Sequence, residues 1–128
     1  RQYMSNSIEF LDQMSNSDVL SLIGKSISTV TSTSLFEGQP TLLCEASSLG
    51  VPSIFPDSGG IKEFFPEDYE LAFDYDSDED LISKLSEVVN RSKMSNYGIL
   101  NQESISKLLD RNEMHEKFEK IISKWVVN

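Results

Sequence analysis

Two glutamates stand on either side of a predicted helix start in the middle of the chain. Glu37 lies in a polar loop, and Glu45 lies about one turn inside the helix that is expected to begin at Pro40. An ionised carboxylate only accepts hydrogen bonds, so each glutamate can bind two hydroxyl donors. A helix start offers free backbone N–H groups and the positive end of a dipole, which suit a phosphate. Two hydroxyl acceptors around a phosphate cradle match a nucleotide diphosphate sugar.

The donors of this cradle are expected from the backbone. Pro40 has no N–H group, so Gln39, Thr41 and Leu42 must supply the N–H groups. Gly38 allows unusual backbone angles or a close ligand approach. From these residues alone, the alternative is that both glutamates are ordinary surface acids near a helix start, where the dipole favours negative charge.

The elements that must position these residues alternate along the chain. Apolar and β-branched stretches predict strands at 8–11, 27–31, 51–55 and 70–75. Apolar spacing and capping residues predict helices at 18–23, 40–49, 78–89 and 104–109, and a last one that starts after Asn112. Such alternation predicts an α/β fold with a parallel sheet and flanking helices. Ligands of parallel sheets bind at the carboxyl ends of strands, and the loop after 27–31 is such a place.

Length and charge limit the function classes. The 128 residues fit one domain, 1–128, whose segment 78–127 is expected to be helical. The net charge of −10 argues against nucleic acid as a partner. The single cysteine, Cys44, is expected in the core and excludes an internal disulfide. An acidic run over 74–80 lacks the glycine and final glutamate of a calcium loop, so no metal site is expected.

A longer ordered pattern surrounds the two glutamates. It reads Ser-x-x-Glu-Gly, then Glu-Ala, Gly-x-Pro before a strand, and Gly-Gly-x-x-Glu after it. The matching residues are Ser34, Glu37, Gly38, Glu45, Ala46, Gly50, Pro52, Gly59, Gly60 and Glu63. In this order the segment resembles the donor domain of the group 1 glycosyltransferases, retaining enzymes of the GT-B fold with Rossmann-like domains. The chain departs from the family at Gln39 and Pro40, where an aromatic residue and a glycine are common.

The resemblance implies a role for each residue. Glu37 would bind the donor sugar at the catalytic centre, and Glu45 would bind the ribose hydroxyls. The remaining donor-binding residues would be Ser34, Gly38, Gln39, Thr41 and Leu42. The enzyme would transfer a hexose from a nucleotide sugar to a glycan or lipid-linked acceptor with retention of configuration, as in bacterial polysaccharide synthesis. No metal or other cofactor would be required.

The resemblance further implies parts that this sequence does not show. These are two upstream strand–helix units, a basic pair that neutralises the diphosphate, and an N-terminal acceptor domain. Without them, the chain is expected to be inactive alone, and the strand at 8–11 must pair differently, lie exposed or pair with another copy. The apolar stripe of the last helix, Phe118 to Trp125, is then expected to drive self-association. The expected location is cytoplasmic, or peripheral at the inner face of the membrane.

Two other functions fit the same residues. One is a non-catalytic nucleotide-binding, sugar-binding or interaction module that has kept the fold. The other is an unrelated α/β phosphate binder of the flavodoxin type. A loss of nucleotide binding in Glu45→Ala, with ribose-free diphosphates unaffected, would favour a donor-type site over the flavodoxin alternative.

Overall fold

The computed structural model describes residues 7–33, 38 and 40–126, which form helices around a small parallel sheet. In chain order the elements are α1 (Asn16–Ile23), β1 (Thr29–Val30), α2 (Thr41–Ser48), β2 (Ser53–Pro56), the 3₁₀ helix η1 (Ile61–Phe64), β3 (Ala72–Phe73), α3 (Asp78–Glu87), α4 (Arg91–Leu108) and α5 (Arg111–Val126). The three strands are parallel in the order β1-β2-β3. The predicted α/β fold with a Rossmann-like parallel sheet is therefore confirmed.

The sheet is organised around its central strand, β2. All four of its residues are buried, as expected for a strand that has neighbours on both edges. Thr29 of β1 is in register with Ser53, and Phe55 is in register with Ala72 of β3. The predicted strands at 27–31, 51–55 and 70–75 are thus present, although each ladder is shorter than its apolar stretch.

The prediction of a strand at 8–11 is wrong. The segment 8–15 has no helix or strand, and the side chains of Ile8, Phe10 and Leu11 are 51%, 79% and 51% exposed. Alternating apolar residues form a strand only where a neighbouring strand completes the hydrogen-bond ladder. No described strand pairs with this segment, so it lies exposed, one of the three outcomes expected above.

The end of α2 is fixed by a glycine, as the sequence predicts. Gly50 has φ of +70°, a left-handed conformation that favours glycine. Its N–H donates to the Ser47 carbonyl at 3.0 Å, and the Val51 N–H donates to the Ala46 carbonyl at 2.9 Å. These two bonds form a Schellman motif, which closes the helix and turns the chain directly into β2.

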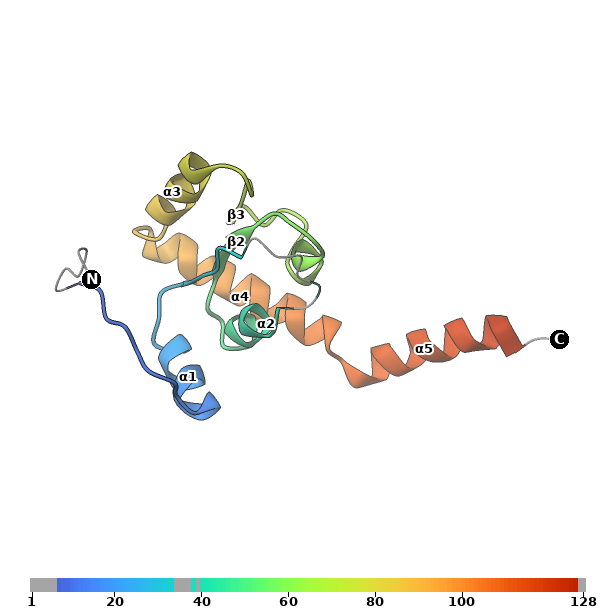
Figure 1. Cartoon of the computed structure of the whole chain (residues 1–128). Helices are drawn as coiled ribbons and strands as arrows, with labels where there is room; N and C mark the ends of the chain where they lie inside the picture. The colour runs from blue at the N-terminus through green and yellow to red at the C-terminus, as the bar shows by residue number, and fades with distance from the viewer. Residues whose placement is uncertain (1–6, 34–37, 39, 127–128) are drawn as a thin grey trace.

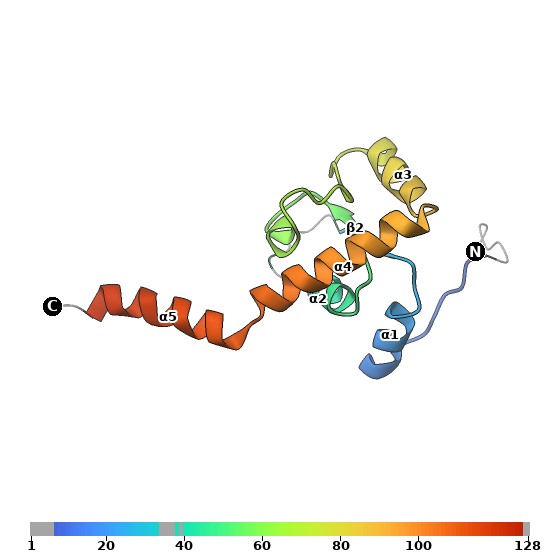
Figure 2. The ribbon, with the colours of Figure 1, turned by 180° about the vertical axis from the view of Figure 1, so that it is seen from behind.

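Helix α4 runs along the body of the molecule and packs on the end of α2 (Figures 1 and 2). Gly98 allows the contact, because a Cβ there would lie 2.9 Å from the Gly50 carbonyl carbon and closer still to its oxygen. The Gln102 side chain donates to the Ser48 carbonyl at 2.9 Å and satisfies one of the last carbonyls of α2. The prediction of a short helix at 104–109 was therefore wrong in extent, since α4 begins at Arg91.

The core is aromatic and lies between the sheet, η1 and α4. Phe55, Phe65 and Tyr69 pack with ring centroids 4.4 to 5.7 Å apart. The buried Tyr69 hydroxyl donates to the Ser53 carbonyl at 2.7 Å and accepts from the Ser53 N–H at 2.9 Å. Burial raises the pKa of Tyr69 to about 12. The Tyr69 hydroxyl thus satisfies both the N–H and the carbonyl of Ser53, as the backbone of a neighbouring strand otherwise would.

Lys93 of α4 joins three elements at the amino end of β3. Its ammonium lies 3.1 Å from Glu70 and 3.0 Å from Glu87, and Tyr97 donates to the Glu70 carboxylate at 2.7 Å. The Tyr97 hydroxyl and Lys93 together lower the pKa of Glu70. Glu70 is exposed and the other three groups are only half-buried, so solvent screens the cluster, which fixes positions more than it adds stability.

Two further features concern the described helices. Helix α5 extends away from the body, and its end is far from the N-terminal segment (Figures 1 and 2). No helix among the described residues combines the length and the apolar character needed to cross a membrane.

Candidate functional site at the carboxyl edge of the sheet

The start of α2 lies in the loop that follows β1, where the sequence predicts a phosphate cradle. Pro40 is the N-cap rather than the first helical residue, and its carbonyl accepts from the N–H groups of Leu43 and Cys44 at 3.1 Å. The N–H groups of Thr41 and Leu42 donate to no described residue. Both residues are exposed, so their N–H groups are placed to meet a ligand.

Glu45 lies one turn further along α2. Leu43, Ala46 and Ser47 form the buried side of the helix, so Glu45 shares the opposite side with Thr41 at i, i+4 spacing. The Glu45 side chain is half-buried and forms no ion pair or hydrogen bond with the described part of the chain. Its carboxylate oxygens therefore accept no hydrogen bond from the described residues and remain available to hydroxyl donors.

The remaining predicted site residues are only partly described. Gly38 is exposed, and a Cβ built on it would meet no atom within 4 Å, so the fold itself does not require glycine there. Ser34, Glu37 and Gln39 lie outside the described residues. The predicted roles of these residues stay predictions. Cys44, expected in the core, is only half-buried.

A cavity of about 210 Å³ lies at the carboxyl ends of all three strands. Its lining residues are Ser32, Thr33, Pro56, Phe73, Tyr75, Asp76, Asp78 and Leu81. Ser32 and Thr33 directly precede the loop that carries the first part of the sequence motif. The aromatic rings offer apolar walls, and the aspartates offer hydroxyl acceptors. We call this the strand-end cavity.

Two side-chain hydroxyls that are inaccessible to solvent lie close to the carboxyl ends of the strands in sequence. The Oγ1 atom of Thr31, directly after β1, and the Oγ atom of Ser58, after β2, are inaccessible to solvent and have no hydrogen-bond partner within the described part of the chain. Buried hydroxyls normally have such a partner. The sequence analysis missed both residues, because single hydroxyls after strands carry no distinctive pattern.

The motif residues Gly59 and Gly60 form the turn after β2. Gly59 has φ of +61°, and the turn leads into η1. Lys62 is the basic residue nearest to this turn in sequence, and its ammonium forms an ion pair with the Asp57 carboxylate at 2.8 Å. Glu63, the last residue of the motif, is exposed and does not cap η1 through its side chain.

The acidic run over 74–80 leads into the start of helix α3. Ser77 caps α3 by accepting from the Asp80 N–H at 3.1 Å, and Asp80 accepts from the Asp74 N–H at 2.8 Å. Within the described residues, no group of three or more His, Cys, Asp or Glu side chains is placed to hold a metal ion.

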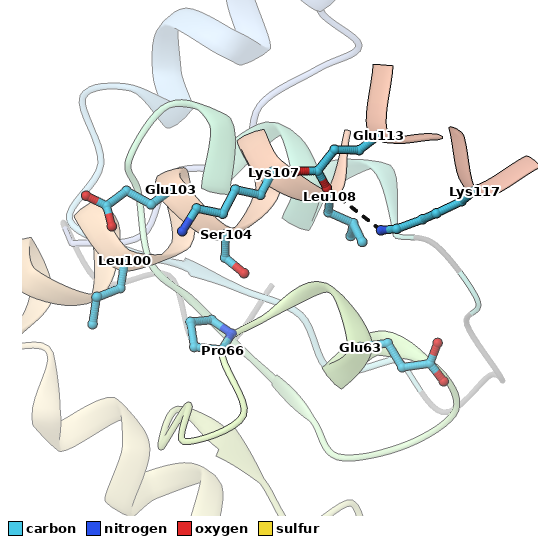
Figure 3. A pocket seen from close by; sticks show the side chains of 9 residues that line it. All are labelled: Glu63, Pro66, Leu100, Glu103, Ser104, Lys107, Leu108, Glu113 and Lys117. Carbon is cyan, nitrogen blue, oxygen red and sulfur yellow. Dashed lines mark ion pairs between the residues drawn. The ribbon is translucent and has the colours of Figure 1, made fainter. Parts of the chain in front are cut away.

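A larger cavity, of about 390 Å³, lies between η1, the end of α4 and the start of α5 (Figure 3). Its lining residues are Glu63, Pro66, Leu100, Glu103, Ser104, Lys107, Leu108, Glu113 and Lys117. Lys117 is paired with Glu113 at 3.9 Å, and three acidic residues face two basic ones around the space. Glu63 is the sole motif residue in this lining, so the cavity is not the predicted site.

Comparison with known proteins identifies the family. Neither the curated proteins nor the solved structures that were compared with the chain gave a match. The sequence model of the family described as "Glycosyl transferases group 1" matches residues 3–104, well over half of the chain. This match includes α1, the whole sheet and α2, with the motif around Glu45. The chain therefore belongs to the group 1 glycosyl transferases, a family of enzymes that transfer sugars.

Proposed function

We infer that this chain binds the nucleotide-sugar donor of a retaining glycosyltransferase of the GT-B type, which transfers a hexose to a glycan or lipid-linked acceptor. The observation that carries the proposal is the start of α2. Its N–H groups at Thr41 and Leu42 and, one turn further, the Glu45 carboxylate form no hydrogen bond with the described residues. Anion donors beside a hydroxyl acceptor are the pair of groups that a ribose diphosphate needs.

The strand-end cavity indicates which part of such a ligand would lie where along the carboxyl edge of the sheet. Ligand pockets usually measure about 300–1,000 Å³, and this cavity measures about 210 Å³. It therefore holds one ring rather than a whole nucleotide sugar. Asp76 and Asp78 would repel a phosphate but accept hydrogen bonds from hydroxyls. A neutral ring in the cavity with the diphosphate at α2 fits both the size and the charge.

Glu37 completes the proposal on the basis of the family motif. Its carboxylate would bind hydroxyls of the donor sugar next to the bond that breaks, with Ser34, Gly38 and Gln39 beside it. In the proposed reaction the acceptor attacks from the face that the nucleotide leaves, so the configuration is retained. The diphosphate leaves as an anion, and the backbone N–H groups of α2 would stabilise part of its charge.

The donor site is tested by thermal shift. UDP, GDP, ADP and their sugar conjugates are added to the chain, to Glu45→Ala and to Glu67→Ala, a control at an exposed loop carboxylate. We expect one nucleotide at about a hundred times its Kd to add about 2.7 kcal/mol, or several degrees. Glu45→Ala should lose most of this shift because the ribose hydroxyls lose their acceptor, whereas Glu67→Ala should keep it.

Inorganic pyrophosphate separates the two halves of the site. It should stabilise the chain and Glu45→Ala equally, since it binds at the N–H groups and has no ribose. A nucleotide shift that survives Glu45→Ala unchanged would refute the ribose role of Glu45. An unrelated phosphate binder would show that result for every ligand of the panel.

Binding without sugar transfer is expected for the chain alone. Neither the strand-end cavity nor α2 contributes a basic side chain among the described residues, so the charge of the leaving diphosphate stays poorly compensated. The same observation favours a second candidate, a non-catalytic module that binds nucleotide or sugar. Assay of nucleotide release from each sugar conjugate checks the expectation, and rapid release with an added acceptor would contradict it.

A further inference from the structure

One ion pair lies at the carboxyl edge of the sheet, where the proposed donor site is. The Lys62 ammonium is 2.8 Å from the Asp57 carboxylate. Asp57 is the first residue after β2, and its N–H donates to the Phe73 carbonyl of β3 at 2.7 Å. Phe73 also lines the strand-end cavity. The backbone beside the carboxylate is thus fixed to the ends of two strands, and the ion pair places the ammonium at the same edge.

The topology brings the amino end of α2 to this edge as well. Helix α2 connects β1 to β2, which are parallel, so it runs back in the opposite direction. Its eight residues span about 12 Å and the four residues of β2 about 13 Å, and only residues 49–52 join the two. The N–H groups of Thr41 and Leu42 therefore lie level with the end of β2, which Asp57 follows.

Lys62 is the only basic residue in the segments that leave this edge. The segments that follow the three strands, 31–40, 57–64 and 74–77, contain no other lysine or arginine, and neither does α2. The acidic residues of the same segments are Glu37, Asp57, Glu63, Asp74 and Asp76. A diphosphate that binds among these carboxylates is repelled unless a cation compensates its charge, and Lys62 is the cation that the edge offers.

The ion pair is weak enough to exchange partners. The Lys62 and Asp57 side chains are 46% and 48% exposed, so water screens their attraction. A diphosphate carries more negative charge than one carboxylate and offers several acceptor oxygens, so it competes for the ammonium. Lysine places its charge on a flexible four-carbon stem, and a change of side-chain rotamer is enough to turn it toward a new partner.

The turn between the two residues does not depend on their ion pair. The Ser58 N–H donates to the Pro56 carbonyl at 2.8 Å, and Gly59 takes the left-handed conformation that the turn requires, with φ of +61°. These features belong to the backbone. The Lys62 side chain can therefore leave its partner without unfolding the turn.

We propose that Lys62 is a diphosphate-binding residue, which exchanges Asp57 for the diphosphate when the donor binds at the start of α2. This inference rests on the proposed function, because the diphosphate is the group assigned to the N–H groups of α2. Asp57 then competes with the ligand for the ammonium, so the two residues have opposite effects on affinity. One lysine offsets only part of the diphosphate charge, and the chain alone is still expected to bind without sugar transfer.

Isothermal titration calorimetry with inorganic pyrophosphate measures the exchange. Lys62→Gln should raise the Kd about tenfold, because the diphosphate loses a charge-assisted hydrogen bond. Asp57→Asn should lower the Kd about threefold, because no carboxylate then competes for the ammonium. A residue pair that only stabilises the turn would shift both variants in the same direction, so the opposite signs are the specific readout.

Matched variants separate this role from net charge and from folding. Lys25→Gln and Asp68→Asn remove the same charges at exposed positions outside the strand-end segments, and each should change the Kd by less than about twofold at physiological salt. Lys62→Arg keeps the charge and should bind pyrophosphate within about threefold of the native chain. The Tm of Lys62→Gln and Asp57→Asn without ligand should stay within about 4 °C, because an exposed ion pair adds little stability.

Three results would overturn the proposal. Equal Kd values for Lys62→Gln and Lys25→Gln would show that Lys62 does not contact the diphosphate, while the phosphate site at α2 would stand. A Kd raised in Asp57→Asn as well as in Lys62→Gln would show that the ion pair only holds the turn. No binding of pyrophosphate by the native chain at about 10 mM would refute the phosphate site at α2, and the role of Lys62 with it.

Discussion

Gly98→Ala is expected to destabilise the fold by at least about 3 kcal/mol, the upper part of the range for an overpacked core. The new methyl group would overlap the Gly50 carbonyl, which is backbone and cannot rotate away. Helix α4 would have to move off the end of α2 and lose its core contacts through Met94 and Ile105. Urea unfolding should show the loss, and the Tm should fall by about 10 °C.

Gly24→Ala is the matched control. Gly24 has φ of −61°, and its added Cβ would lie 3.4 Å from the nearest atom, the Leu20 carbonyl oxygen. We expect a change within about 1 kcal/mol. Equal stability of Gly98→Ala and Gly24→Ala would show that α4 does not pack on Gly50 as described.

Tyr69→Phe is expected to cost about 2–4 kcal/mol at neutral pH. The ring stays in the aromatic core, but the N–H and the carbonyl of Ser53 both lose their partner at a buried position. Each unsatisfied backbone group costs about 1–3 kcal/mol. Tyr97→Phe is the control, because its hydroxyl bonds the exposed Glu70, where water can replace it. Chemical denaturation of both variants measures the difference.

Alkaline pH should reduce the difference in free energy of unfolding between the native chain and Tyr69→Phe. Burial raises the pKa of Tyr69 from 10.0 to about 12, so the unfolded chain releases the proton first. The stability linked to this group is complete below pH 10 and falls by about 3 kcal/mol as the pH rises to 12. Phenylalanine has no such proton, so a gap that stays constant from pH 9 to 12 would contradict the buried phenol.

Local signals in the sequence were sufficient for the central part of the fold. Gly50 predicts the end of α2, Ser77 caps α3 as expected, and the apolar stretch 51–55 contains β2. The start of helix α4 at Arg91 was not predicted, because its buried positions do not form an apolar pattern. Met94, Gly98, Asn101 and Ile105 have helical spacing, but two of the four are not apolar. A close helix contact selects a glycine there, and no periodicity of hydrophobic residues reveals it.

The candidate site was predictable where it is continuous in sequence. The start of α2, the exposed Thr41 and Leu42, and Glu45 all follow from one motif and one helix. The strand-end cavity was not predictable, because its walls come from three separate segments that only the sheet brings together. Residues such as Phe73 and Tyr75 read in sequence as a strand and its end, with no sign of a shared space.

The Schellman turn and the glycine contact hold α2 at its carboxyl end, while the groups proposed to bind the donor are at its amino end. Eight residues of helix span about 12 Å, so a tilt of about 5° at the held end moves the other end by about 1 Å. A displacement of that size is enough to spoil a catalytic geometry. Substitutions around Gly50 that leave the protein folded should therefore still shift the amino end of α2, and with it the proposed phosphate-binding N–H groups.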